Sequence, residues 1–178
     1  GAYFFFYFRR RQQQQEKKYL LRKKMYELEM TALRSQMNPH FIFNSLNSIS
    51  NYILKADITN ANLYLSKFSV LIRKILQHTK NSLISLPEEI KLLQLYLELE
   101  KLRFADKMNF SITVSEGILQ QDISIPSMVI QPYVENAVKH GIAPLPDRSG
   151  TITVDFKISG NYLVCTIEDN GIGINKSK

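Results

Sequence analysis

The chain has 178 residues and is 44% hydrophobic, which excludes a disordered protein and leaves room for one ordinary domain or two small ones. Its formal net charge is +7, but nine basic and three acidic residues place +6 of that charge in residues 1–37. Because this segment begins with an aromatic, apolar run and no nucleic-acid-reading motif accompanies it, we expect no direct nucleic-acid partner.

The N-terminal segment combines the aromatic run AYFFFYF with the basic triplet RRR at residues 9–11. The run is far shorter than the roughly 20 residues that cross a bilayer, so we expect no complete span in this chain. Aromatic residues followed at once by arginines are typical of a helix that leaves the membrane on its cytoplasmic side. We therefore interpret residues 1–11 as the end of a membrane span and the basic residues that follow it on the cytoplasmic side. A tag remnant with a disordered basic tail is the alternative.

Residues 12–55 predict a long helix, because they contain no glycine and Pro39 is their only proline. Alternating spacings of four and three between apolar residues indicate a heptad seam against a second helix. The apolar residues of this seam are Tyr26, Met30, Leu33 and Met37. The same spacing continues to His40 and Asn44. Since a proline inside a helix costs about 3 kcal/mol, we expect a kink beside His40.

A second helix is predicted over residues 63–76, after the polar break KADITNAN at residues 55–62. Two helices joined by a short connection form an antiparallel hairpin. Because a single hairpin leaves a wide apolar stripe uncovered, we expect two copies of the chain to form a dimeric four-helix bundle.

The remaining residues predict an α+β unit, so we place a domain boundary near residue 83. A helix is expected from Pro87, with two acidic residues in its first turn, to about Phe104. The other predicted elements are a strand over residues 108–115, a helix over 126–141 ended by Gly141, and strands over 150–159 and 161–170 that turn at Gly160 and Asn161.

Three short motifs hold the residues that can do chemistry, and the first is QMNPHFIFN around His40. A neutral imidazole is a good nucleophile near neutral pH, which makes histidine a useful phosphate acceptor. Asn44 lies one helical turn further on and can orient the ring. For this motif taken alone, a structural histidine is the alternative.

The second motif is YVENAVKHG. On a helix, Asn136, Lys139 and His140 share one face, and Glu135 lies beside them. An amide oxygen can bind Mg²⁺, and a lysine can neutralise phosphate oxygens. The alternative is a solvated polar face over a buried side of the helix.

The third motif is EDNGIG, in which an aspartate ends an apolar strand and two glycines follow. Asp169 can accept a hydrogen bond from an adenine amino group, while Gly171 and Gly173 would let the backbone approach a nucleotide closely. The motif lacks the spacing of a Rossmann or Walker loop, so on its own a simple turn is the alternative.

Taken together and in this order, the stretches LRSQMNPHFIFNSLNSI, LPEEIKLLQLYLELEKLRF, IPSMVIQPYVENAVKHGI and DNGIGI resemble the LytS/YehU-type sensor histidine kinases. The resemblance extends from Leu28 to Ile174. It implies an α+β protein in which a helical hairpin forms a dimeric four-helix bundle and a partial GHKL α/β sandwich follows. The signalling helix and phosphotransfer hairpin would occupy residues 12–83, and the ATP-binding part would occupy residues 84–178.

The resemblance also implies a reaction and its partners. His40 would accept the γ-phosphoryl group of ATP, with Asn44 orienting it, and would pass the group to an aspartate on a response regulator. That regulator would combine a receiver domain with a LytTR-type DNA-binding output. The kinase itself would be a homodimer attached to the membrane through its N-terminal span.

The nucleotide site implied by the resemblance lies in the second and third motifs. Asn136 would bind the Mg²⁺ ion that accompanies ATP, and Lys139 and His140 would contact the phosphates. Asp169 would recognise adenine. The first glycine box would consist of Gly171 and Gly173.

Three departures from the family pattern bear on activity. Phe41 follows His40, where many other histidine kinases have an acidic base. Pro132 stands where related ATPases have an asparagine or a water-activating glutamate, so ATP hydrolysis is not expected as the main activity, and Glu135 is a candidate substitute. The chain stops at Lys178, before the ATP lid and second glycine box of the family, so we expect weak ATP binding and poor autophosphorylation. A non-catalytic dimeric scaffold of the same fold remains the alternative function.

Overall fold

The computed structural model describes residues 15, 39–78, 83–146 and 149–173. The chain divides into two units, residues 1–41 and residues 42–178, and the α+β fold lies in the second. The predicted heptad seam ending at Met37 lies outside the described residues. The predicted kink lies at their edge, because helix α2 begins at Pro39.

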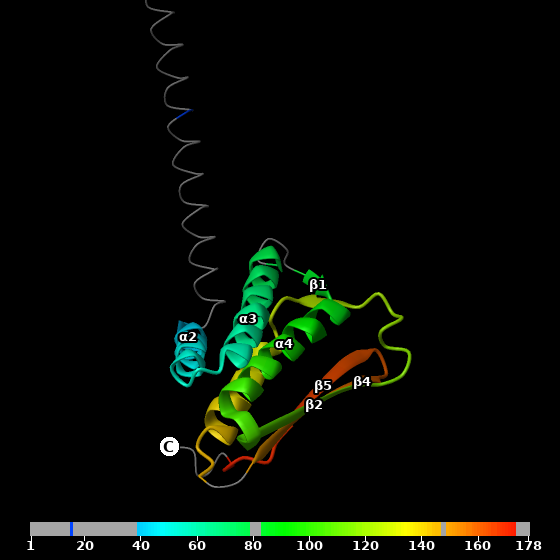
Figure 1. Ribbon diagram of the computed structural model, residues 1–178. Helices are drawn as coiled ribbons and strands as arrows, with labels where there is room; N and C mark the ends of the chain where they lie inside the picture. The colour runs from blue at the N-terminus through cyan, green and yellow to red at the C-terminus, as the bar shows by residue number, and fades with distance from the viewer. Residues whose placement is uncertain (1–14, 16–38, 79–82, 147–148, 174–178) are drawn as a thin grey trace, which may run out of the picture. The chain divides into compact units, whose positions relative to one another are not determined.

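Two helices joined by a short turn begin the described part of the chain (Figure 1). They are α2 (Pro39–Leu54) and α3 (Ile58–His78), as the apolar periodicity predicted. Asp57 precedes α3 and accepts a hydrogen bond from the backbone N–H of Asn60 at 3.1 Å, the usual bond of an N-terminal cap. Across the hairpin, the Tyr64 hydroxyl donates to Ser45 Oγ at 3.3 Å.

The third long helix is α4 (Leu86–Phe104), which confirms the helix predicted from Pro87. It ends in the short 3-10 helix η1 (Ala105–Lys107). Ion pairs tie α4 to α3, because Lys67 contacts Glu98 and Lys74 Nζ lies 2.9 Å from Glu88 Oε2. These contacts cross the boundary placed near residue 83, and that boundary stays a prediction.

The strands form one three-stranded sheet and one two-stranded ladder. In the larger sheet, the order is β2 (Met108–Val114), β4 (Gly150–Ser159) and β5 (Tyr162–Asp169). Strand β4 pairs with β2 in parallel and with β5 in antiparallel orientation, and the predicted turn of this hairpin is confirmed, with Gly160 at φ +60°. The ladder pairs β1 (Leu83–Ser85) with β3 (Ser124–Pro126), two strands that were not predicted.

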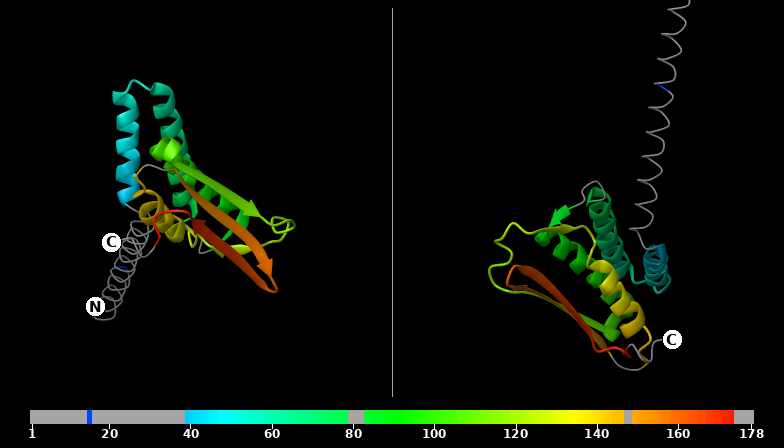
Figure 2. Two further views of the ribbon diagram at one scale, coloured as in Figure 1. Left: turned by 90° about the horizontal axis from the view of Figure 1, so that it is seen from below. Right: turned by 180° about the vertical axis from the view of Figure 1, so that it is seen from behind.

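The core lies between the larger sheet and the helices on one of its faces. Figure 2 shows α4 and the helical segment after residue 131 on the same side of this sheet. Alternate residues of β4 point into this layer and are 0–1% exposed, namely Ile152, Val154 and Phe156. Helix α4 contributes a matching buried stripe that includes Leu92, Leu93, Tyr96 and Leu97. The architecture is thus a helical part followed by an α+β sandwich.

The helix predicted over residues 126–141 is shorter at its start than expected. It consists of α5 (Gln131–Asn136), continued by the π-helix η2 (Ala137–Ile142). The prediction was wrong for residues 126–130, where Met128 has a left-handed backbone with φ +59°. The physical reason is a competing acceptor, because the buried carboxylate of Glu89 accepts the backbone N–H groups of Met128 and Ile130.

Candidate functional site

The candidate phosphoacceptor His40 lies in the first turn of α2, and its side chain is exposed. Asn44 follows one helical turn later and is half-buried, and its carbonyl accepts a hydrogen bond from Ser48 Oγ at 2.9 Å. His40 belongs to the unit of residues 1–41, whereas the candidate nucleotide residues belong to the unit of residues 42–178. The roles of both side chains remain predictions.

The candidate phosphate-binding residues occupy the exposed side of the α5–η2 segment. Asn136, Lys139 and His140 are exposed, while Val134 and Val138 are buried against the core. The segment from residue 137 onward has π-helical hydrogen bonding, a rare geometry that often occurs at functional sites. The sequence thus placed the polar face correctly without indicating the change in helix type.

The end of this helical segment packs directly on the loop that contains the third motif. The N–H of Ile172 donates to the carbonyl of Gly141 at 3.2 Å. A Cβ atom built on Gly171 would lie 2.4 Å from the Cα of Gly141. A Cβ atom on Gly141 would lie 2.4 Å from Oδ1 of Asp169. Glycine at position 171 is therefore needed for the two main chains to come this close, whereas a side chain at position 141 would meet the carboxylate of Asp169.

The loop after β5 is held by its own polar groups. Asn170 donates its N–H to the carbonyl of Thr151 at 3.2 Å, and its side-chain Oδ1 accepts the N–H of Thr151 at 2.7 Å. The Gly171 N–H donates to Asp169 Oδ1 at 2.9 Å, which orients the exposed Asp169 carboxylate. Gly173 has φ +80°, a backbone conformation that favours glycine.

These contacts bring the second and third motifs together. The segment that carries Lys139 and His140 continues through Gly141 to Ile142, and Gly141 touches the loop that follows Asp169. The segment that carries exposed donors suited to phosphate oxygens therefore packs on the loop that follows an oriented carboxylate, which can accept a hydrogen bond from an amino group.

Glu135, the candidate catalytic carboxylate of the second motif, is partly buried. Its Oε1 accepts a hydrogen bond from the Gln131 side chain at 3.0 Å. Glu100 on α4 is 1% exposed and lies 2.6 Å from the guanidinium of Arg103. Burial raises the pKa of Glu100 to about 7, Arg103 acts to lower it, and the negative charge of Glu135 raises it further. Helix α4 thus places a second carboxyl group within electrostatic reach of α5.

Sequence reasoning missed three residues that shape this site: Glu89, Gly141 and Asn170. The sequence pattern indicates Glu89 only as an acid that favours the start of a helix. It indicates Gly141 only as the residue that ends a helix. A signal for Glu89 was present, because residues 89, 92, 93, 96, 97 and 100 follow the spacing of one helix face. An acid on an apolar face indicates a buried carboxylate with a specific partner.

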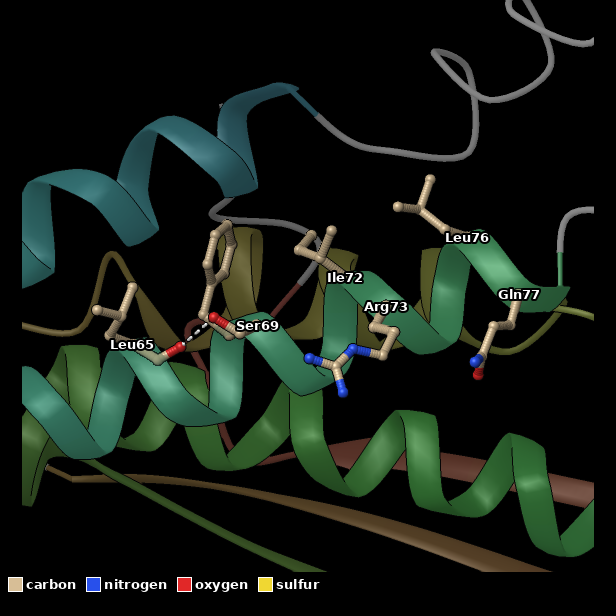
Figure 3. Close-up of a pocket in the computed structure, with 7 residues that line it drawn as sticks. Leu65, Ser69, Ile72, Arg73, Leu76 and Gln77 are labelled. Carbon is tan, nitrogen blue, oxygen red and sulfur yellow. Dashed lines mark hydrogen bonds between the residues drawn. The ribbon is translucent and has the colours of Figure 1, made fainter.

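A separate groove of about 790 Å³ lies along α3 (Figure 3). Its lining among the described residues is Leu65, Phe68, Ser69, Ile72, Arg73, Leu76 and Gln77. Leu65, Ile72 and Leu76 point to one side of the helix, away from α4. The groove is mainly apolar and shares no residue with the candidate nucleotide site.

Two further observations concern only the described residues. No group of three or more His, Cys, Asp or Glu side chains among them is arranged to hold a metal ion. None of the described helices combines the length and the apolar character needed to cross a membrane.

Known protein families match both halves of this architecture. Residues 28–108, which include α2, α3 and α4, match the family described as histidine kinase. These residues belong to the histidine kinase family. Residues 121–178 match the family of histidine kinase-, DNA gyrase B- and HSP90-like ATPases, and they contain α5, η2, β4 and β5.

The chain is also similar in sequence to individual sensor kinases. The chain is 35% identical to the sensor protein LytS of Oceanobacillus iheyensis over 156 residues, which is 88% of this chain and 26% of that protein. It is 34% identical to the sensor histidine kinase BtsS of Escherichia coli strain K12 over 80% of this chain and 24% of the relative. It is 31% identical to the sensor histidine kinase/phosphatase LytS of Staphylococcus aureus over 88% of this chain and 26% of the relative. The chain thus spans about a quarter of the length of these relatives.

Proposed function

We propose that this chain is the core of a sensor histidine kinase of a two-component system, which phosphorylates His40 at the expense of ATP. The observation that supports this most strongly is the direct packing of Gly141 on Gly171, which joins the helical segment that carries the exposed Asn136, Lys139 and His140 to the loop after Asp169. The similarity to sensor kinases over most of the chain supports the same assignment. The complete reaction and its partners are part of this proposal.

In this proposal, the adenine amino group donates to Asp169, whose orientation is fixed by the Gly171 N–H. Lys139 and His140 contact phosphate oxygens, and Gly173 lets the backbone turn beside the nucleotide. Asn136 supplies an amide oxygen for Mg²⁺, and this ion neutralises phosphate charge when it is bound. The chain's own contribution is to orient these groups on one exposed surface.

The acceptor step needs little from the protein beyond position and charge. An unprotonated ring nitrogen of His40 forms a bond to the γ-phosphorus, the bond from that phosphorus to the bridging oxygen breaks, and ADP leaves. Asn44 orients the imidazole by accepting or donating at the other ring nitrogen, and Glu135 is the candidate general base. The phosphoryl group then passes from His40 to an aspartate of a receiver domain in a response regulator with a LytTR-type output.

We also propose that the helical hairpin forms a homodimer and that the protein is attached to the cytoplasmic face of the bacterial membrane through an N-terminal span. Large apolar side chains on α2 and α3 support the dimer because water contacts them in the single chain. Their exposed fractions are 65% for Phe43, 51% for Leu46, 80% for Leu54, 42% for Leu63 and 48% for Leu65. Burying such a surface in a four-helix bundle stabilises it.

The direct test is incorporation of ³²P from [γ-³²P]ATP with Mg²⁺, scored for the acid-labile and base-stable bond of phosphohistidine. The chain is assayed alone and mixed with a version that carries the complete nucleotide-binding domain of a LytS-type relative. We expect label on the chain when the second protein is present. His40→Gln should abolish that label, while His78→Gln serves as the matched control because His78 lies on α3 outside the site.

The outcomes separate the kinase from its alternative. Label that depends on His40 and not on His78 supports the proposal. An absence of label on every chain that retains His40, with nucleotide binding shown for the second protein, would favour a dimeric scaffold without catalysis. Label that survives His40→Gln would move the acceptor to another residue.

A further inference from the structure

Two consecutive glutamates in the first turn of α4 have different environments. Glu88 pairs with cations, since its carboxylate lies 2.9 Å from Lys74 on α3 and 3.1 Å from Lys91 one turn further along α4. Glu89 is 2% exposed and accepts hydrogen bonds from the loop that precedes α5. The same helical turn thus contacts α3 with one carboxylate and the residues that precede α5 with the other.

The contact of Glu89 uses both carboxylate oxygens. Oε2 accepts the N–H of Met128 at 2.9 Å, and Oε1 accepts the N–H of Ile130 at 3.4 Å. Two acceptors on one rigid group fix the spacing of two backbone N–H groups, so the carboxylate determines the path of residues 128–130. Met128 has φ +59°, a conformation that a residue with a side chain adopts only when its surroundings hold it there.

The pairing of β1 with β3 also joins the start of α4 to the chain that precedes α5. Ile84 is registered against Ile125, and the N–H of Leu86 donates to the carbonyl of Ile123 at 2.8 Å. The start of α4 is therefore joined to the chain before α5 by a short ladder and by the Glu89 carboxylate. Among these links, only the carboxylate reaches Ile130, the residue that immediately precedes α5.

Ile130 is the last residue before α5, and its carbonyl accepts the N–H groups of Tyr133 and Val134. Asn136 lies six residues further, roughly 9 Å along the helix axis. A change in the position of Ile130 is passed along this short helix to Asn136 and then to Lys139.

We propose that Glu89 is a positioning residue of the nucleotide site, whose ionised carboxylate sets the start of α5 and thereby places Asn136 and Lys139 for ATP. This inference rests on the proposed function. Glu89 does not touch the nucleotide in this assignment. Its effect is transmitted through the backbone of residues 128–130.

The proposal makes the charge of Glu89 matter for nucleotide binding. Protonation converts one carboxylate oxygen into a hydroxyl, which accepts a hydrogen bond from an N–H more weakly than a charged oxygen does. Protonation therefore weakens one of the two bonds. Burial raises the pKa of Glu89, and its bonds to Met128 and Ile130 act to lower it. The titratable groups whose charges couple to Glu89 are His78 on α3, which favours the ionised form, and Cys165 on β5, whose thiol pKa is raised in part by Glu89.

The test compares three variants of the full chain for binding of Mg-ATP, titrated into the millimolar range and followed by a fluorescent nucleotide analogue. Glu89→Gln keeps the size but replaces one acceptor oxygen with an NH₂ group that faces a donor. Glu89→Asp keeps both acceptors on a shorter side chain. Glu88→Gln is the matched control, because it removes the neighbouring charge and leaves the contacts of Glu89 intact.

We expect Glu89→Gln to weaken binding at least tenfold, Glu89→Asp to recover part of that loss, and Glu88→Gln to change affinity less than twofold. Thermal melting of each variant separates a loss of folding from a loss of affinity. A folded Glu89→Gln variant with wild-type affinity would overturn the positioning role. A wild-type chain that binds no nucleotide would overturn the proposed function itself, and the positioning role with it.

A second measurement uses only the wild-type chain, so it stands even where Glu89→Gln does not fold. The amide proton shifts of Met128 and Ile130 report the titration of the carboxylate that accepts from them. If the ionised form binds nucleotide tenfold more tightly, saturation with Mg-ATP must lower the pKa of Glu89 by about one unit, because the coupling is reciprocal. A pKa that stays the same or rises on binding would contradict the proposal.

Discussion

The main chains of Gly141 and Gly171 are in direct contact: a Cβ atom on Gly171 would lie 2.4 Å from the Cα, the carbonyl carbon and the carbonyl oxygen of Gly141. The two glycines are 30 residues apart in the sequence and lie in two different segments, Gly141 in the π-helix and Gly171 in the loop after β5. Their contact joins the two candidate nucleotide motifs, and it has no room for a methyl group.

Alanine at these two positions should have different effects. Gly171→Ala forces a methyl group into the backbone of Gly141, which cannot move without shifting η2, so we expect a loss of about 1–3 kcal/mol in the free energy of unfolding. Gly141→Ala instead meets the carboxylate of Asp169, an exposed side chain that can rotate away. Its stability loss should be smaller, but its nucleotide affinity should fall because Asp169 leaves its position. Urea denaturation and nucleotide titration of both variants measure this difference.

Gly117→Ala is the control for that comparison. Gly117 has φ +81°, and a Cβ atom added there would meet no atom within 4 Å, so this position tests the cost of backbone conformation without a clash. We expect about 1 kcal/mol from the left-handed backbone and no change in nucleotide affinity. Equal affinities for Gly141→Ala and Gly117→Ala would count against a role for Asp169 in binding.

Glu100 should make the stability of the fold depend on pH between about 4.5 and 7. Its pKa in the folded chain is raised from 4.5 to about 7, chiefly by burial. The stabilisation from its protonated form is therefore complete below the unfolded pKa and is lost as the pH rises to the folded one. The wild type should lose about 2–3 kcal/mol relative to Glu100→Gln between pH 5 and pH 8. Urea denaturation at the two pH values measures this loss.

Arg103→Met tests whether the pKa of Glu100 responds to a neighbouring charge in the expected direction. Arg103 lowers the pKa of Glu100, so removing its charge should move the pH-dependent transition above that of the wild type. Stability curves of wild type and Glu100→Gln that run parallel from pH 5 to pH 8 would show that Glu100 has an ordinary pKa.

The ion pairs of Glu88 should stabilise the junction of α3 and α4 at neutral pH. Hydrogen bonds from Lys74 and Lys91 lower the pKa of Glu88 to about 2, so this stabilisation is present above pH 4.5 and is lost as the pH falls toward 2. The Lys74 side chain is 28% exposed and that of Lys91 is 61% exposed. We expect Lys74→Met to cost about 1 kcal/mol at pH 7 and Lys91→Met a few tenths, after allowance for solvent screening.

Salt provides the control for the Glu88 prediction. Denaturation curves in 1 M NaCl should show a smaller difference between Lys74→Met and the wild type, because the Debye length falls to about 3 Å. If the difference is unchanged by salt, the lost contribution is the packing of the lysine side chain and not its charge.

Tyr52 should stabilise the contact between α2 and the end of α4. Its hydroxyl donates to the carbonyl of Leu102 at 2.6 Å in a half-buried setting. Tyr52→Phe leaves that carbonyl without the donor, so we expect a loss of about 1 kcal/mol in the free energy of unfolding. Tyr162→Phe, at a side chain that is 77% exposed, is the matched control and should be neutral. Equal melting temperatures for the two variants would refute a role for this bond.

The regular elements of the fold could be predicted because their patterns are local. Helix α4 begins at its proline and two acids, and the β4–β5 hairpin turns at Gly160, as the sequence indicated. The three-residue strands β1 and β3 could not be found, because a strand of this length contains too few residues to show a period of two. The start of α5 was misplaced because Glu89, about 40 residues earlier, accepts the N–H of Ile130 that a longer helix would use, and because Met128 has a left-handed backbone.

The candidate site was predictable in its residue types and not in its geometry. The sequence pointed to Asn136, Lys139 and Asp169 as chemically suitable groups, and their roles stay predictions. What no local pattern could show is that Gly141 and Gly171 meet, since that depends on the packing of η2 on the sheet. The buried acids Glu89 and Glu100 could have been recognised from their position on the apolar face of α4.

The place of β4 in the middle of the sheet also has a consequence for how the chain folds during synthesis. Strand β2 is registered with β4 from Met108 and Gly150 onward, a separation of 42 residues, and among the described residues β4 is its only ladder partner. At about 5–20 residues per second, a ribosome needs roughly 2–8 s to deliver that partner. During this interval, α4 has already been made and can cover the apolar side of β2, so the helix protects the nascent strand from aggregation until β4 arrives.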